Sequence, residues 1–236
     1  MLWPMHAILI ILLLLLFAAI IFLPHKWLTY TFKKYSLPND RYPGSGAQFA
    51  EHLLKRLDIN DVQVEQADKK MGDHYDPLAK KIRLSEDFFK GQSLTAIVVA
   101  AHETGHAIQH HSRYPLFRLR IVLAFVAAIC EKTGVILLML MPILTLISRS
   151  PVVSIGTTVA AVLMLGIGVI VHIVTLPVEW DASFRRALPL LEAGDYLKPE
   201  DYPAARRILK AAAFTYVAGA LLSLLNMSRW IAILKR

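Results

Sequence analysis

The chain has almost no cysteine: Cys130 is the single one among its 236 residues. One cysteine cannot form an internal disulfide, and it excludes a zinc site built from cysteines. Cys130 lies in the apolar run 121–130, where free cysteine usually acts as a small hydrophobic residue, and we predict that it is buried. A zinc site in this chain would therefore need other ligands.

Acidic residues are also scarce, with 18 Asp and Glu against 26 Lys and Arg, a formal charge of +8. No recognisable nucleic-acid module accompanies this charge, and the basic residues gather beside apolar runs. Lysine and arginine at such positions orient membrane proteins. We therefore predict that nucleic acid is not a partner and that the lipid bilayer is one.

Hydrophobic residues make up 56% of the chain and are concentrated in long runs, which is typical of a membrane protein. The first run, 5–23, is followed rather than preceded by lysines, which favours an uncleaved anchor over a signal peptide. The run 121–147 is interrupted by Glu131 and Lys132, so it is either one long helix or an interfacial piece and a short span. Further spans are predicted over 152–175 and 211–225.

The distribution of basic residues predicts the orientation of these spans. The segments 24–120 and 176–210 hold 15 and 6 of the 26 Lys and Arg residues. By the positive-inside rule both segments lie in the cytoplasm.

The segment 25–115 has a different composition from the spans. An amphipathic helix is expected over 48–57, and short strands at 62–64 and 81–84, where polar and apolar residues alternate. The residues 73–77 between them are typical of a turn. We predict a small α+β unit, in which the 81–84 strand could lie at a sheet edge and pair with an extended substrate.

A helix over 93–111, capped by Ser93, carries the strongest chemical signal. His102 and His106 are one turn apart, so both imidazoles project to one side, as two zinc ligands do. Glu103 follows the first histidine and can take a proton from water at the open coordination position. The alternative is an ordinary polar helix with two exposed histidines.

A catalytic zinc site normally has three protein ligands, so a third residue is required. His110 lies two turns beyond His102 and reaches poorly, and His172 lies within a span. Glu179 is the better candidate, because two membrane crossings return it to the side of His106 and Pro177 can begin a helix there. Its alternative role is a solvated acid in a first helical turn.

Four motifs in order, GDHYDP, AAHETGHAIQH, LPVEWDAS and AAAFTYVAGALLSLL, resemble the YugP-like neutral zinc metallopeptidases of bacterial membranes. The resemblance implies one zinc ion held by His102, His106 and Glu179, with Glu103 as catalytic acid and base, in a fold related to the HtpX-like gluzincins. In those enzymes an aspartate follows the glutamate ligand by one helical turn, where this chain has Ser183. Asp181, two residues after Glu179, is instead the candidate for the outer carboxylate that fixes the tautomer of a metal-bound histidine.

The pair His74 and Tyr75 has two interpretations. Either side chain could hydrogen-bond the oxyanion of a tetrahedral intermediate, so both are candidate catalytic residues. The alternative is a hydrogen-bonded turn.

Together these patterns predict an α-helical integral membrane protein with a small α+β, zincin-like cytoplasmic catalytic unit. The predicted function is a zinc-dependent endopeptidase that cleaves peptides or membrane proteins. A zinc-binding membrane scaffold or chaperone is the alternative, and a metal transporter is disfavoured because the ligands lie outside the spans. The expected parts are an anchor (1–24), the catalytic unit (25–120), a two-span hairpin (121–175), a third-ligand helix and loop (176–203) and a C-terminal membrane helix (204–236).

Overall fold

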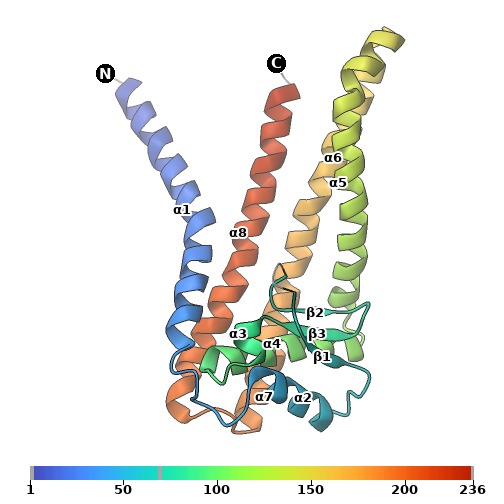
Figure 1. Cartoon of the computed structure of the whole chain (residues 1–236). Helices are drawn as coiled ribbons and strands as arrows, with labels where there is room; N and C mark the ends of the chain where they lie inside the picture. The colour runs from blue at the N-terminus through green and yellow to red at the C-terminus, as the bar shows by residue number, and fades with distance from the viewer. Residues whose placement is uncertain (1–2, 69–70, 235–236) are drawn as a thin grey trace. The chain divides into compact units, whose positions relative to one another are not determined.

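The computed structural model describes residues 3–68 and 71–234, which are mostly helical with one small sheet (Figure 1). The chain divides into two compact units. The first, called the α/β unit, comprises Met1–Tyr114 and Val178–Thr215, and the second, called the helical unit, comprises Pro115–Pro177 and Tyr216–Arg236. The sequence of one unit is thus interrupted by most of the other.

The helical unit contains α5 (Pro115–Ser148), most of α6 (Pro151–Trp180) and the end of α8 (Tyr202–Leu234). The runs Pro115–Ser148 and Pro151–Ala193 are long and apolar enough to cross a membrane, judged by length and composition. They include the spans expected over 121–147 and 152–175.

Two residues in the helical unit bear on the sequence predictions. Helix α5 continues without a break through Glu131 and Lys132, which favours the single long helix. Cys130 is half-buried rather than buried, because it lies on a helix that exposes most of its apolar side chains.

The spans expected over 5–23 and 211–225 fall within α1 (Trp3–Tyr35) and α8. Many of the side chains in these stretches lie outside the described residues, so their crossing of a membrane stays a prediction.

The sheet has the strand order β1–β3–β2, formed by β1 (Gln63–Gln66), β3 (Lys81–Leu84) and β2 (His74–Asp76). Strand β3 is central, parallel to β1 and antiparallel to β2. The proposed pairing of residues 81–84 with a substrate is therefore wrong, because both edges of β3 are already paired. The expectation of a turn at 73–77 is wrong for His74–Asp76, which form β2, whereas Pro77 does begin a turn. A three-residue strand is too short to show the alternation that would have predicted it.

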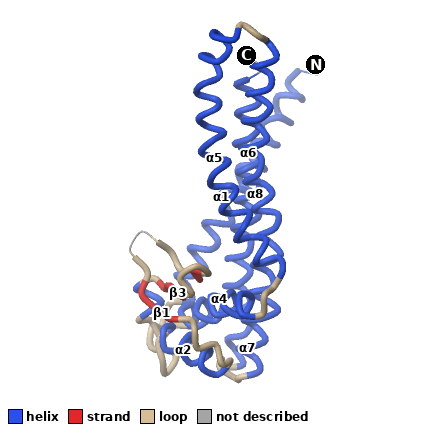
Figure 2. Tube along the Cα trace, turned by 90° about the vertical axis from the view of Figure 1, so that its right-hand side faces the viewer, coloured by secondary structure: helices blue, strands red, loops and turns tan. Residues whose placement is uncertain are grey.

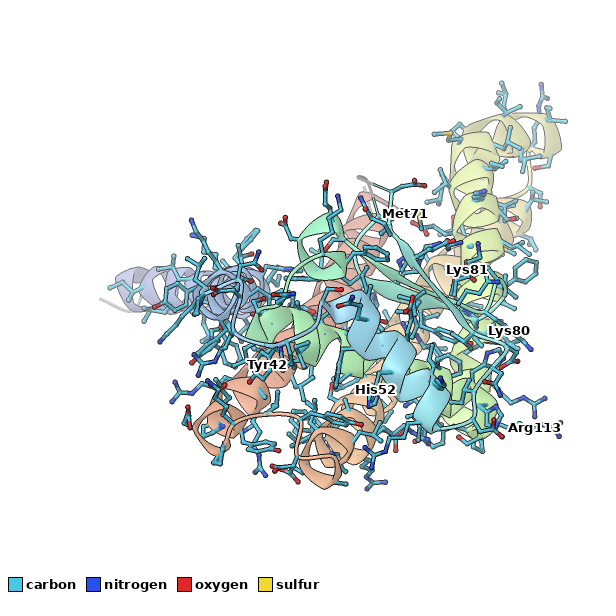
Figure 3. The ribbon with its side chains drawn as sticks, turned by 60° about the horizontal axis from the view of Figure 1, so that its bottom comes forward. Tyr42, His52, Met71, Lys80, Lys81 and Arg113 are labelled. Carbon is cyan, nitrogen blue, oxygen red and sulfur yellow. The ribbon has the colours of Figure 1, made fainter. Side chains whose placement is uncertain are left out.

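The two faces of the sheet differ in character. Tyr75 and Ile82, which are register partners, are buried on one face. On the other, Glu65 pairs with Lys81 and Arg83, and Arg83 also pairs with Asp76. Figure 3 labels Lys80 and Lys81 at the β2–β3 turn and Met71 at the opposite end of these strands. The apolar face of the sheet is thus the one available to pack on helices.

Besides α1, four helical segments of the α/β unit contact α4 (Leu94–His111). They are α2 (Gly46–Arg56), α3 (Glu86–Phe89), the π-helical η1 (Asp181–Ala187) and α7 (Leu188–Ala193). The short 3₁₀ helix η2 (Pro199–Asp201) leads into α8. Figures 1 and 2 both show the strands beside α4. The core between these helices is apolar and includes Leu53, Val98, Leu191, Ile208 and Leu209.

Pro177 lies inside α6 rather than at the start of a helix, because α6 runs on through Trp180 into η1 and α7. A proline inside a helix lacks the amide for one hydrogen bond, and the π-helical turns begin only at Asp181. Glu179 consequently sits in a continuous helical rod.

A buried acid fastens the start of α8 to the loop before α2. Asp201 is 4% exposed and accepts hydrogen bonds from Arg41 Nε at 2.8 Å and from the Tyr42 hydroxyl at 2.6 Å. Burial by itself would raise the pKa of Asp201, but these hydrogen bonds outweigh it and the pKa is lowered. Tyr42 also belongs to the core, so this contact links loop, helix and core.

The lowered pKa of Asp201 predicts how stability depends on pH. A carboxyl whose pKa is lower in the folded state stabilises the fold above its unfolded pKa of about 3.9, and this contribution is lost as pH falls below that value. Asp201→Asn should therefore cost about 1–3 kcal/mol at neutral pH and flatten the fall in Tm between pH 5 and pH 3. Thermal unfolding in detergent measures both effects.

Glu200→Gln is the matched control. The Glu200 carboxylate also pairs with Arg41, but the side chain is 67% exposed and its distance to Arg41 Nη2 is long, at 4.0 Å. Equal Tm values for the two variants across this pH range would contradict the prediction.

Candidate metal centre

Helix α4 positions the two histidines. Ser93 adopts an extended backbone and its side chain accepts a hydrogen bond from Ala96 N at 3.2 Å, which satisfies one of the unpaired amides at the helix start. The 18-residue helix is buried over most of its length, so its rotation is fixed by packing. The side chains of His102 and His106 are 13% and 6% exposed, with ring centroids 4.8 Å apart.

Glu179, near the end of α6, meets both imidazoles. It is 1% exposed, and its Oε2 lies 3.2 Å from His102 Nε2 and 3.3 Å from His106 Nε2. One ligand atom from each of the three residues can be chosen so that all lie within 4.8 Å of one another. The third residue predicted from topology is therefore brought to the histidine pair.

The three side chains fit a zinc ion. Tetrahedral zinc with ligands at about 2.0–2.1 Å holds neighbouring ligand atoms about 3.3 Å apart. The two distances from Glu179 Oε2 match that separation. Two imidazoles and one carboxylate are also a donor set of catalytic zinc sites, which keep a fourth position for water or substrate. His102, His106 and Glu179 thus lie close enough to bind one metal ion.

Comparison with known proteins agrees with this geometry. The family model described as "Putative neutral zinc metallopeptidase" matches residues 9–235. The chain belongs to this metallopeptidase family. The "Putative membrane protease YugP" of Bacillus subtilis (strain 168) is 33% identical over 205 residues, which cover 86% of each chain. No solved structure matches the chain.

Glu103, the candidate acid and base in this family member, lies beside the same cluster. It is 6% exposed, and its burial raises the pKa of its carboxyl group. The neighbouring His102 and His106 oppose this rise, whereas Glu179 and Asp73 add to it. Glu103 follows His102 directly and precedes His106 by three residues, so it lies in the same turn of α4 as the two histidines.

Each histidine has a hydrogen-bond partner on its second ring nitrogen. Ser183, at the sequence position where the resemblance leads one to expect an aspartate, has its Oγ 3.1 Å from His102 Nδ1. Gln109 Oε1 lies 2.9 Å from His106 Nδ1. Asp181 is joined to His106 through Gln109, whose Nε2 is 2.8 Å from Asp181 Oδ2. Gln109 thus stands between His106 and Asp181, the outer carboxylate predicted from the sequence.

Gln109 was missed by the sequence reasoning. Its signal was present, because it follows His106 by three residues and so lies on the same helix face. It is also one of the fully buried polar side chains of α4.

The other two predicted site residues, His74 and Tyr75, are both held by hydrogen bonds. His74 Nδ1 lies 2.7 Å from the carbonyl oxygen of Gly72, to which it can donate. The Tyr75 hydroxyl lies 2.8 Å from Nδ1 of His110, one turn beyond His106 on α4. His110 is thus engaged by β2, and the oxyanion role of His74 or Tyr75 stays a prediction.

Gly105 sets how closely the two ligand-bearing segments approach. A Cβ placed at Gly105 would lie 2.7 Å from the carbonyl oxygen of Ala182 and 3.4 Å from its Cα. Those atoms are backbone, so they could accommodate a methyl group only if η1 moved. Glu179 precedes Ala182 by three residues and would move with it.

We therefore predict that Gly105→Ala separates Glu179 from the histidine pair. Displacement of catalytic groups by about 1 Å costs on the order of 100-fold in rate, and zinc affinity should fall as well. Zinc content after dialysis and the rate of casein cleavage are the measurements.

Gly156→Ala is the control, because a Cβ at this helical glycine meets nothing within 4 Å. It should leave both values unchanged. Full zinc content and full activity in Gly105→Ala would refute the assigned role of this contact.

Proposed function

We propose that this metallopeptidase family member is a membrane-embedded zinc endopeptidase with its active site at the cytoplasmic face of the bacterial plasma membrane. The observation that carries the proposal is the contact of one buried carboxylate oxygen with two imidazole nitrogens at tetrahedral spacing. Solvated histidines and a first-turn acid, the alternatives from sequence, do not account for a Glu179 that is 1% exposed.

His102, His106 and Glu179 would hold the zinc. When bound, zinc polarises the scissile carbonyl and lowers the pKa of water. Glu103 would accept a proton from the attacking water as the new C–O bond forms, and would then deliver that proton to the leaving amine as the C–N bond breaks. The burial of Glu103 suits this role, because the raised pKa makes its carboxylate a stronger base towards water than an ordinary glutamate.

Glu103→Gln separates a peptidase from the zinc-binding scaffold or chaperone. The amide has the same shape but cannot act as a base, so casein cleavage should fall by about 10²–10⁴-fold while zinc stays bound. His106→Ala is the comparison, since it should lose zinc and cleavage together. Retained cleavage in Glu103→Gln would exclude the proposed mechanism.

Aromatic and basic residues of the α/β unit favour a location of this unit at the bilayer surface. Trp27 of α1 packs edge-to-face on Phe214 of α8 at 5.8 Å, and Trp180, next to Glu179, is 46% exposed. Tryptophan gathers at membrane interfaces, and the basic Lys33 and Lys34 follow on α1. Thr95 of α4 donates to the carbonyl oxygen of Phe32 at 3.1 Å, so α4 is tied to this stretch.

The metal cluster within the α/β unit also disfavours a transporter, whose transit site would lie within the spans. The substrates we propose are peptides or membrane-protein segments that reach the cytoplasmic surface. The name of the Bacillus relative, a membrane protease, supports this class. We also propose that the chain has the five parts expected from its sequence, with boundaries at residues 24, 120, 175 and 203.

The cytoplasmic location can be tested by thiol labelling in a Cys130→Ser background. Lys90 is exposed in the α/β unit, and Ser148 is exposed at the end of α5, on the opposite side of the membrane in the proposed topology. An impermeant maleimide applied to intact spheroplasts should label Ser148→Cys but not Lys90→Cys, and lysis should expose both. Labelling of Lys90→Cys before lysis would overturn the orientation.

A further inference from the structure

Gln109 connects the two segments that carry the candidate ligands. It is fully buried, and all of its polar atoms are engaged. Its Oε1 lies 2.9 Å from His106 Nδ1, and its Nε2 lies 2.8 Å from both the Val178 carbonyl oxygen and Asp181 Oδ2. One side chain thus contacts the histidine of α4, the residue before Glu179 and the start of η1.

These contacts determine which way the amide points. A carbonyl oxygen and a carboxylate only accept hydrogen bonds, so the group facing Val178 and Asp181 must be the NH₂. The amide oxygen then faces His106, and His106 Nδ1 must carry the hydrogen that is donated to it. The Nε2 lone pair of His106 is consequently left on the side of Glu179, where a metal would accept it.

Asp181 is itself fixed by a cation. Arg186 Nε donates to Asp181 Oδ2 at 2.7 Å, and its NH1 donates to Ser112 Oγ at 3.3 Å. The guanidinium also lies 5.4 Å from the ring centre of Tyr114. The acceptor for Gln109 is therefore a compensated carboxylate, held between the end of α4 and η1.

We propose that Gln109 is the positioning residue of the metal centre: its amide fixes the tautomer and ring orientation of His106 and ties α4 to the segment that carries Glu179. The inference rests on the proposed function, because it assigns a role in holding the metal. It goes beyond the ligand set in identifying a neutral amide where an outer carboxylate or carbonyl usually serves.

The first test is Gln109→Met, which keeps a side chain of similar length but removes the amide. Loss of such an outer partner typically weakens metal binding 10–100-fold, and we expect a loss of that size in zinc affinity, measured by chelator competition. The visible absorption of the Co²⁺-substituted protein should also change in shape, because an unconstrained His106 ring alters the ligand field. Unchanged affinity and spectrum would overturn the proposal.

The second test exchanges the two polar partners. Gln109→Glu still offers an acceptor to His106 but places a carboxylate against Asp181 and the Val178 carbonyl, so zinc affinity should fall as in Gln109→Met. Adding Asp181→Asn supplies a donor to the introduced carboxylate and removes the repulsion between the two acids. Zinc affinity should then recover at least 5-fold, whereas Gln109→Met with Asp181→Asn should not recover. A double variant as weak as Gln109→Glu would show that Gln109 merely fills space.

Thr95→Val is the matched control, because Thr95 is another fully buried polar residue of α4 whose hydroxyl bonds the distant Phe32 carbonyl. It should lower Tm without changing zinc affinity or the Co²⁺ spectrum. Wild-type protein that binds no stoichiometric zinc would contradict the proposed function itself. Wild-type binding with Gln109 variants that bind equally well would contradict only the role of Gln109.

Discussion

The structure depends on a buried carboxylate, Glu179, held against two imidazoles. Burying an acid is costly unless a positive partner compensates its charge. The nitrogens of His102 and His106 that face Glu179 can bind the same metal cation as its carboxylate. Much of the α/β unit serves to keep these three groups together. Ser93 starts the helix that carries the histidines, and the apolar core fixes its rotation.

Close approach of two helical backbones makes this arrangement possible. Gly105 lets α4 contact η1 without an intervening side chain. The π-helical turns of η1 present Ser183 to His102 and Asp181 to Gln109, and π segments of this kind occur often at functional sites. The ligands, their hydrogen-bond partners and the tight contact are therefore one packed assembly in which no member can move alone.

The sequence carried enough information for the parts of this assembly that depend on local periodicity or on counting spans. The cap at Ser93 and the spacing of His102 and His106 follow from helix geometry, and Glu179 followed from the number of membrane crossings. The order of the strands was not accessible, because a three-residue strand such as β2 gives no alternation. The role of Ser183 was not accessible either, since it depends on the register of a π-helix, which sequence periodicity does not reveal, whereas the spacing of Gln109 from His106 on one helix was visible.

The division of the α/β unit into two separated stretches of chain has a consequence for biosynthesis. A ribosome completes 1–114, with both histidines, well before it releases Val178–Thr215, and all of α5 and nearly all of α6 are made in between. A nascent or truncated chain therefore lacks Glu179, the last of the three candidate metal ligands. The complete ligand set exists only after both α5 and α6 have been translated.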